Sequence, residues 1–288
     1  MLADALLQAD RASKDLTAEA LGISDRKAAA VILAGEGGVV AGLAEVSYLL
    51  QKRGVEVAIE KNDGDVIRPG DTVLRAEGSQ AKLLALERVG LNLLQRMSGI
   101  ATAAHCLQER VQKHSPSAWI VGTRKTPWSL VDKRALHLGG AGTHRLNLGD
   151  AILIKNNHLA LLAAREEDAA PIAIERAWNF RKEAAFIEVE VRSEGAARAA
   201  AKTFRRLLEE TTEDYPCLVM LDNMEAAQAG AVVEMLRREQ LWDYTLVEAS
   251  GRISAGNVEA YAASGVDAIS VGSLTHSVRA LDLSQKIS

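Results

Sequence analysis

The chain has 288 residues, of which 48% are hydrophobic and 25% are charged, so it can bury one sizeable core or two moderate ones. Its formal net charge of -4 argues against a nucleic-acid-binding surface, because such surfaces are normally basic.

Several features favour a cytoplasmic protein that does not enter a membrane. The first residues lack the basic start and apolar core of a signal peptide. The most apolar stretch, residues 28–44, is interrupted by Glu36 and glycines. Cys106 and Cys217 lie far apart without metal-binding spacing, which suits reduced cysteines in a reducing compartment.

The first part of the chain predicts a small α+β domain. Residues 1–24 indicate a first helix, with Asp15 and Thr17 as candidate caps. Residues 26–38 then predict a strand that ends at a glycine turn. Residues 41–54 predict a helix with its apolar side chains on one face. Short strands separated by turn dipeptides follow.

A strongly helical pattern occupies residues 82–114. Gly90 and Gly99 interrupt the pattern, so two helices joined at Ser98–Gly99 are predicted rather than one. We expect the architecture to change near this join.

After residue 118, apolar runs end in polar residues about every thirty residues, with helical segments between most of them. The polar ends are Arg124, Lys155, Glu190, Asp222, Ser250 and Gly272. We interpret the runs as apolar without alternation, as expected of strands buried on both faces. The pattern is typical of βα units in a parallel barrel or a doubly wound sheet. Six units are fewer than the eight of a complete barrel.

Positive charge is concentrated between Val121 and His158, against the acidic balance of the whole chain. The cations there are Arg124, Lys125, Lys133, Arg134, Arg145 and Lys155, and Asp132 and Asp150 are the acids that oppose them. Since ligands of such folds bind at the C-terminal ends of the strands, we expect a small anionic ligand here.

The later strand ends carry different groups. Glu190 and Asp222 bring carboxylates, and Ser250–Gly251 and Gly272–Ser273 bring small residues with free backbone N–H groups. A phosphorylated sugar with Mg²⁺ would use both kinds of group together. A single acid at a strand end is usually a solvated or capping residue, but a series of polar strand ends is less ordinary.

An ordered set of motifs makes the chain resemble the quinolinate phosphoribosyltransferase family, also called carboxylating nicotinate-nucleotide pyrophosphorylase, almost from end to end. The motifs are ERVGLNLLQRMSGIAT at Glu87–Thr102, GTRKT at Gly122–Thr126, HR at His144–Arg145, LIKNNH, EVEV, LDN, EASG and VGSLTHS.

The resemblance implies an α/β fold: an N-terminal α+β sandwich domain and an incomplete parallel α/β barrel of six or seven strands. It places the sandwich in residues 1–104, rejoined by residues 277–288, and the barrel with the phosphoribosyl site in residues 105–276. It also implies transfer of a phosphoribosyl group from phosphoribosyl pyrophosphate to quinolinate, with Mg²⁺ and decarboxylation. The expected assembly is a homodimer with shared active sites, or a higher oligomer.

The family's site residues carry over onto matching positions of this sequence. Those that hold quinolinate match Arg88, Arg124, His144, Arg145 and Lys155, with Arg88 donated across the dimer interface. Those around the phosphoribosyl group match Lys125, Glu190, Asp222, Ser250, Gly251, Gly272 and His276. The resemblance thus implies Lys125, Lys155, Glu190 and Asp222 as catalytic residues, with Glu190 and Asp222 holding the metal directly or indirectly.

Two alternatives stay open at this point. One is a related phosphoribosyltransferase of the same fold, acting on another pyridine carboxylate, such as the molybdenum-operon homologue. The other is a catalytically silent ligand-binding homologue. The chain also departs from the family pattern: Asn156 stands where many relatives have Asp, Arg252 replaces a glycine, and Trp128 is unusual at its position.

Overall fold

The computed structural model describes residues 2–211 and 214–288, which divide into two compact units. The first unit contains Met1–His105, Arg134–Gly140 and Ser277–Ser288. The second contains Cys106–Lys133 and Ala141–His276. The predicted barrel range, residues 105–276, was continuous, whereas here the segment Arg134–Gly140 belongs to the first unit.

The N-terminal residues form two short helices, α1 (Leu2–Ala9) and α2 (Leu16–Ala20), so the prediction of one helix was wrong. Asp15 caps α2, because its carboxylate accepts hydrogen bonds from the N–H groups of Thr17 and Ala18 at 2.9 and 3.1 Å. The capping residue was thus predicted, but the helix that it starts is only one of two.

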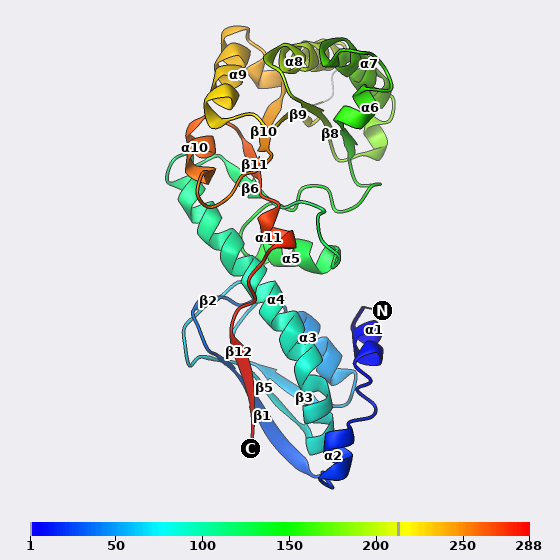
Figure 1. Ribbon diagram of the computed structural model, residues 1–288, viewed down its shortest axis with the longest axis vertical. Helices are drawn as coiled ribbons and strands as arrows, with labels where there is room; N and C mark the ends of the chain where they lie inside the picture. Colours follow the sequence, from blue (N-terminus) through cyan, green and yellow to red (C-terminus); the bar gives the residue numbers. More distant parts are fainter. Residues whose placement is uncertain (1, 212–213) are drawn as a thin grey trace. The chain divides into compact units, whose positions relative to one another are not determined.

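An antiparallel sheet forms the centre of the first unit. In the described residues its strand order is β12 (Leu283–Ile287), β1 (Lys27–Ala34), β5 (Thr72–Ser79) and β3 (Glu56–Ile59). Figure 1 shows the C-terminal strand β12 beside the N-terminal strand β1. A small ribbon of β2 (Gly38–Val39) with β4 (Val66–Ile67) and the helix α3 (Leu43–Gln51) complete this α+β unit.

One long helix, α4 (Gln80–Gln112), replaces the two helices that were predicted with a join at Ser98–Gly99. Gly99 lies inside this helix, and the position needs glycine because a Cβ atom there would collide with the carbonyl oxygen of Arg279. Ser98 is also used in packing, since its hydroxyl accepts the N–H of Ala41 at 3.0 Å. These small residues therefore allow close packing and do not break the helix.

The second unit contains a parallel sheet, and each predicted apolar run is a strand of it. In the described ranges the order is β6 (Trp119–Val121), β11 (Ala268–Ser270), β10 (Leu246–Ser250), β9 (Cys217–Asp222), β8 (Ile187–Val191) and β7 (Ile152–Ile154). Within this unit the first strand, β6, pairs with the last, β11, as in a barrel. The strands β6 and β7 are the two edges of the sheet. The predicted incomplete α/β barrel is confirmed, with its opening between β6 and β7.

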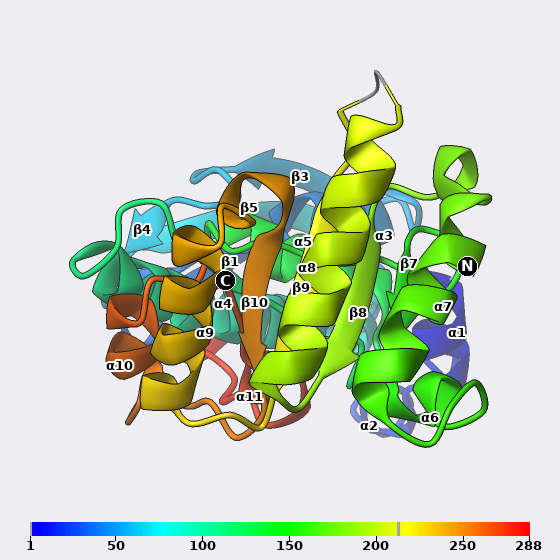
Figure 2. The same cartoon turned by 90° about the horizontal axis from the view of Figure 1, so that it is seen from above.

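Helices cover the outer face of this sheet (Figure 2). They are α7 (Glu166–Trp178), α8 (Glu194–Glu209), α9 (Ala226–Arg238) and α10 (Val258–Ala263). The other helical elements after α4 are α5 (Leu130–Leu138), α6 (Asn156–Leu159), α11 (Ser273–His276) and the 3-10 turns η1 (Arg181–Glu183) and η2 (Trp242–Tyr244). The buried face of α8 is rich in alanine, which allows the helix to lie close to the sheet. None of the helices in the described part of the chain has both the length and the apolar character needed to cross a membrane.

Candidate active site

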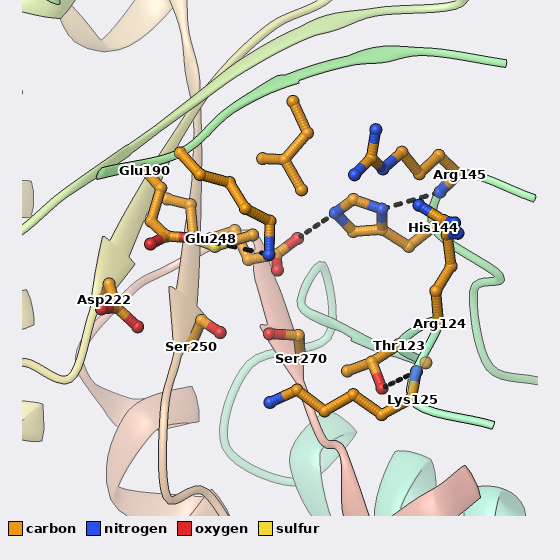
Figure 3. Close-up of a pocket in the computed structure, with 14 residues that line it drawn as sticks. Thr123, Arg124, Lys125, His144, Arg145, Glu190, Asp222, Glu248, Ser250 and Ser270 are labelled. Carbon is orange, nitrogen blue, oxygen red and sulfur yellow. Dashed lines mark hydrogen bonds and ion pairs between the residues drawn. The ribbon is translucent and has the colours of Figure 1, made fainter. Parts of the chain in front are cut away.

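The C-terminal ends of the barrel strands surround a cavity of about 470 Å³ (Figure 3). Many of the predicted site residues line it, namely Arg124, Lys125, His144, Arg145, Lys155, Glu190, Asp222 and Ser250. Residues that the sequence did not single out also line it, namely Gly122, Thr123, Leu153, Met220, Glu248 and Ser270. The parallel sheet brings together the residues at the ends of its strands, because all the strands end at the same edge, and the segment before β7 adds His144 and Arg145.

The cations of the cavity come from irregular segments beside the barrel opening. Arg124 follows β6, whereas His144 and Arg145 precede β7. Arg145 is buried, and its guanidinium donates to the carbonyl of Ala151 at 3.5 Å. Burial, and then the positive charge of Arg124, lower the pKa of Arg145. The two guanidinium groups therefore repel each other, and an anion bound between them would relieve this repulsion.

Two carboxylates, those of Glu190 and Asp222, lie at the C-terminal ends of the adjacent strands β8 and β9 on the other side of the cavity (Figure 3). Burial, and then the negative charge of Asp222, raise the pKa of Glu190. Lys155 opposes this effect, with its ammonium 4.0 Å from a carboxylate oxygen of Glu190. Two neighbouring carboxylates beside an open cavity fit Mg²⁺, which prefers oxygen ligands and shares them with phosphates. Asn156 also contributes here, because its backbone N–H bonds to Glu190.

Of the predicted phosphoribosyl residues after β10 and β11, Gly272 lies close to His276 and Lys125, whereas Gly251 lies beside Asn223. A Cβ atom at Gly272 would come within 3.1 Å of the His276 ring and 3.7 Å of the Lys125 side chain. Gly251 has φ +100°, and a side chain there would collide with Asn223. Both positions therefore suit glycine, because neighbouring side chains pack closely against the backbone there.

Arg88 is the predicted site residue that belongs to the other unit. It lies on α4, with 60% of its side chain exposed and its guanidinium 3.9 Å from the carboxylate of Glu87. Its contact with quinolinate remains a prediction.

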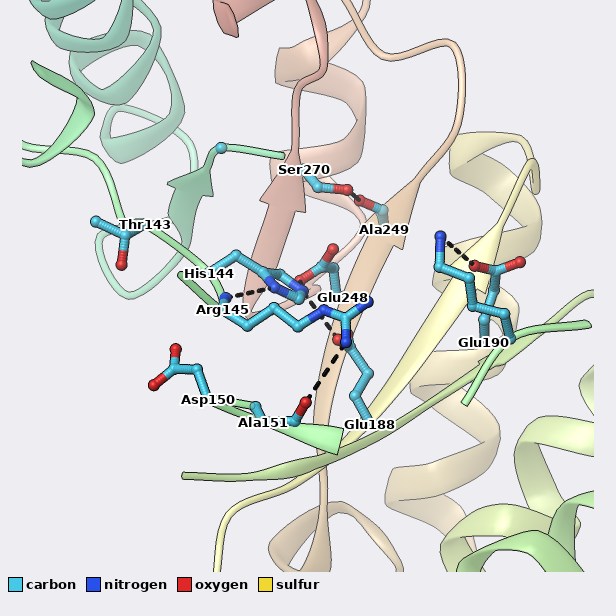
Figure 4. A network of polar contacts seen from close by, with 12 residues as sticks. Thr143, His144, Arg145, Asp150, Ala151, Glu188, Glu190, Glu248, Ala249 and Ser270 are labelled. Carbon is cyan, nitrogen blue, oxygen red and sulfur yellow. Dashed lines mark hydrogen bonds and ion pairs between the residues drawn. The ribbon is translucent and has the colours of Figure 1, made fainter. Parts of the chain in front are cut away.

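Two fully buried glutamates beneath the cavity were missed in the sequence (Figure 4). The Nε2 atom of His144 lies 2.9 Å from a carboxylate oxygen of Glu188 and 3.5 Å from one of Glu248. Burial raises the pKa of each glutamate to about 8. The signal was present, because Glu188 alternates with Glu190 in EVEV and Glu248 interrupts an apolar run. The prediction of strands buried on both faces is confirmed for β8, which is buried at every position, although glutamates alternate with apolar residues along it.

His144 is held in one orientation by its surroundings. Its backbone has φ +53°, and its Nδ1 atom accepts the N–H of Arg145 at 2.7 Å. The neutral ring therefore carries its proton on Nε2, toward the two glutamates. Burial lowers the pKa of His144, whereas the negative charge of Glu248 opposes that effect.

The ligand atoms of His144, Glu188 and Glu248 lie within 4.8 Å of one another, which raises the question of a second metal site. Two cations already lie near these carboxyl groups: the charge of Arg145 acts on Glu188, and that of Lys133 acts on Glu248. With pKa values raised to about 8, both glutamates are largely protonated near neutral pH, which does not favour a second metal ion.

Comparison with known proteins agrees with this geometry. The sequence matches the quinolinate phosphoribosyl transferase N-terminal domain over residues 15–98 and the C-terminal domain over residues 100–286. The chain belongs to the quinolinate phosphoribosyl transferase family.

Individual relatives are similar over nearly their whole length. A probable carboxylating nicotinate-nucleotide pyrophosphorylase of Archaeoglobus fulgidus is 37% identical, over 90% of this chain and 93% of the relative. One from Methanothermobacter thermautotrophicus is 36% identical, over 98% of this chain and 96% of the relative. The crystal structure of NadC from Streptococcus pyogenes has a TM-score of 0.84 and 32% identity, and covers 100% of this chain and 95% of that one.

Proposed function

We propose that this enzyme transfers the phosphoribosyl group of phosphoribosyl pyrophosphate to quinolinate with decarboxylation. The products are nicotinate mononucleotide, pyrophosphate and carbon dioxide, so the reaction would serve NAD biosynthesis. The observation that carries the proposal is one cavity lined by opposed sets of charges, with cations at the barrel opening and carboxylates on β8 and β9.

The cations supply the binding site for quinolinate. This pyridine carries two carboxylates, and guanidinium groups pair with carboxylates in a bidentate manner. An ion pair at ~4 Å contributes on the order of 4 kcal/mol at an effective dielectric near 20, and desolvation offsets part of that. Several cations are therefore needed, and Arg124, Arg145 and Lys155 line the same cavity. His144 adds an oriented ring beside them.

The carboxylates act on the sugar. When the ring nitrogen of quinolinate attacks the anomeric carbon, pyrophosphate leaves and positive charge develops on the ribose. Glu190 and Asp222 stabilise that charge electrostatically and orient the sugar. Mg²⁺, when bound by these carboxylates and the substrate phosphates, would neutralise the pyrophosphate. The attacking nitrogen carries no proton, so the reaction needs no general base.

Lys125 and the glycine loops act on the phosphates. The ammonium of Lys125 neutralises the leaving group, while the backbone N–H groups near Gly251 and Gly272 bind phosphate oxygens. After transfer the ring is a pyridinium. When the adjacent carboxylate leaves as carbon dioxide, the electron pair of the broken C–C bond stays on the ring carbon, where the neighbouring positive nitrogen stabilises it, and a proton from solvent then forms the C–H bond of the product. Lys155 and Arg145 keep the remaining carboxylate in place.

The assembly and location are part of the same proposal. We infer a cytoplasmic homodimer, or a higher oligomer, in which Arg88 reaches the quinolinate site of the partner subunit. The exposure of the Arg88 guanidinium on α4 supports this role, because an exposed cation is available to a second copy.

The test is an assay with purified protein, quinolinate, phosphoribosyl pyrophosphate and Mg²⁺. We expect carbon dioxide and pyrophosphate in equal amounts, and no product when nicotinate replaces quinolinate. Turnover of nicotinate without carbon dioxide would instead support the related phosphoribosyltransferase. Quinolinate binding without any turnover would support the silent homologue.

A further inference from the structure

Lys133 is a fully buried lysine for which the motifs suggested no role. Only 2% of the residue is exposed. Its ammonium donates hydrogen bonds to the carbonyl oxygen of Thr143 and, at 3.4 Å, to that of Gly122. A buried ammonium is costly and lysine is almost never fully buried unless it is paired, so the position calls for a specific reason.

The two carbonyl groups lie where two chain segments separate. The end of β6 forms a parallel bridge between Val121 and Gly142. In it, Gly122 donates its N–H to Gly142 at 3.0 Å, and Gly142 donates to Ile120 at 2.8 Å. Beyond this pair, the two segments are joined through the ammonium of Lys133.

The predicted quinolinate ligands follow within two residues of these carbonyls. Gly122 comes two residues before Arg124, and Thr143 comes immediately before His144 and Arg145. Lys133 therefore holds both segments at the point that sets the distance between their cations. Short side-chain links of this kind orient ligand-binding groups because they limit the freedom of the backbone beside them.

The charge of Lys133 has a second consequence for the cavity. Burial, and then the positive charge of Arg124, lower the pKa of Lys133 to about 8, while the charge of Glu248 opposes this effect. The lysine thus interacts electrostatically with residues that line the cavity. Its positive charge would favour a doubly negative ligand over a singly negative one.

The other cation after β6 has a separate anchor. The hydroxyl of Thr275 donates to the carbonyl of Lys125 at 3.2 Å, and the N–H of Lys125 donates to the hydroxyl of Thr123 at 3.2 Å. Lys125 therefore keeps its position relative to the β11 loop without help from Lys133. This separation predicts that loss of Lys133 affects one substrate more than the other.

We propose that Lys133 is a positioning residue for the dicarboxylate substrate: it fixes the spacing between Arg124 and the His144–Arg145 pair without touching the ligand. The proposal rests on the proposed function, because it assumes that these cations hold quinolinate.

The test compares Lys133→Met with Lys113→Met, which removes an exposed lysine of the same unit. For each variant KM for quinolinate, KM for phosphoribosyl pyrophosphate and kcat are measured, and thermal unfolding shows whether it is folded. We expect Lys133→Met to raise KM for quinolinate at least ~10-fold, since charge-assisted contacts of Arg124 and Arg145 weaken together. KM for phosphoribosyl pyrophosphate should change less than ~3-fold, because Lys125 keeps its own anchor.

A second variant separates hydrogen bonding from charge. Lys133→Gln keeps one donor group without the charge, so its KM for quinolinate should lie between those of wild type and Lys133→Met. If either folded variant bound quinolinate like Lys113→Met, the proposal would be overturned. Loss of folding in both variants would assign Lys133 to the fold alone and overturn it as well. Inactive wild-type protein would instead refute the proposed function.

Discussion

Around the cavity, Glu190, Asp222 and Ser250 sit on regular strands, where the sheet itself sets their positions, with Asp222 paired to Ser250. Arg124 and His144 on the opposite side lie in irregular segments, and His144 has a left-handed backbone. That side is held by buried side-chain charges. The difference teaches that the two sides of the site are positioned differently. The strand side, with Glu190, Asp222 and Ser250, is positioned by backbone hydrogen bonds of the sheet. The irregular side, with Arg124 and His144, is positioned by electrostatic contacts of side chains, which single substitutions can remove.

The largest effect is expected on the strand side. Asp222→Asn should lower kcat by about 100-fold or more, because a preorganised charge that stabilises the transition state is lost. KM for quinolinate should stay within about threefold of wild type, since the cations are unchanged. Steady-state kinetics measure both constants. Unchanged turnover would remove Asp222 from the metal or ribose role.

A smaller effect, and one on binding, is expected on the irregular side. Arg145→Ala should raise KM for quinolinate by ~10- to 100-fold, since each charge-assisted hydrogen bond contributes about 1.5–3 kcal/mol. Arg124→Ala should act in the same direction with less loss of packing, because Arg124 is exposed. Wild-type affinity in both variants would contradict the pocket assignment.

Mixing two inactive variants tests whether the irregular side is completed by a second subunit. Arg88→Ala and Lys125→Ala proteins, mixed and allowed to exchange subunits, should recover about a quarter of wild-type activity, because half the dimers would contain one intact site. Each variant alone should stay inactive. An inactive mixture with proven subunit exchange would place Arg88 outside the partner's site.

The smallest effect concerns stability. Burial, and then the neighbouring Glu188, raise the pKa of Glu248 from 4.5 to about 8. As pH rises through that window, the unfolded chain has lost a proton that the folded protein retains, so Glu248 makes the folded state progressively less stable. Between about pH 5 and 8, the Tm of Glu248→Gln should therefore fall less than that of wild type, by several °C.

Calorimetry across this pH range provides the measurement, with Ser250→Ala as the control on the strand side. The control should follow wild type, since Ser250 does not titrate. If Tm changed with pH in the same way for Glu248→Gln and wild type, the pKa of Glu248 would not be raised by folding, and the prediction would be wrong.

Much of the fold could be predicted because the barrel strands are locally encoded. Each run of apolar residues ends in polar ones, so the strands and their ends were correct from β6 to β11. The helices were harder. The prediction failed at Gly99, because the sequence could not show that the backbone of Arg279 packs against it. A glycine has the same local signal whether it breaks a helix or admits a neighbour.

The sequence by itself determined the groups at the strand ends, such as Arg124, Lys155, Glu190 and Asp222, because strand ends are set by the local hydrophobic pattern and parallel strands end together. Only the tertiary structure decided how the cations are held. The contacts of His144 with Glu188 and Glu248, and those of Lys133 with Thr143 and Gly122, join residues from different elements. Their burial, which gives them their shifted pKa values, is a property of the packed interior and not of any local stretch.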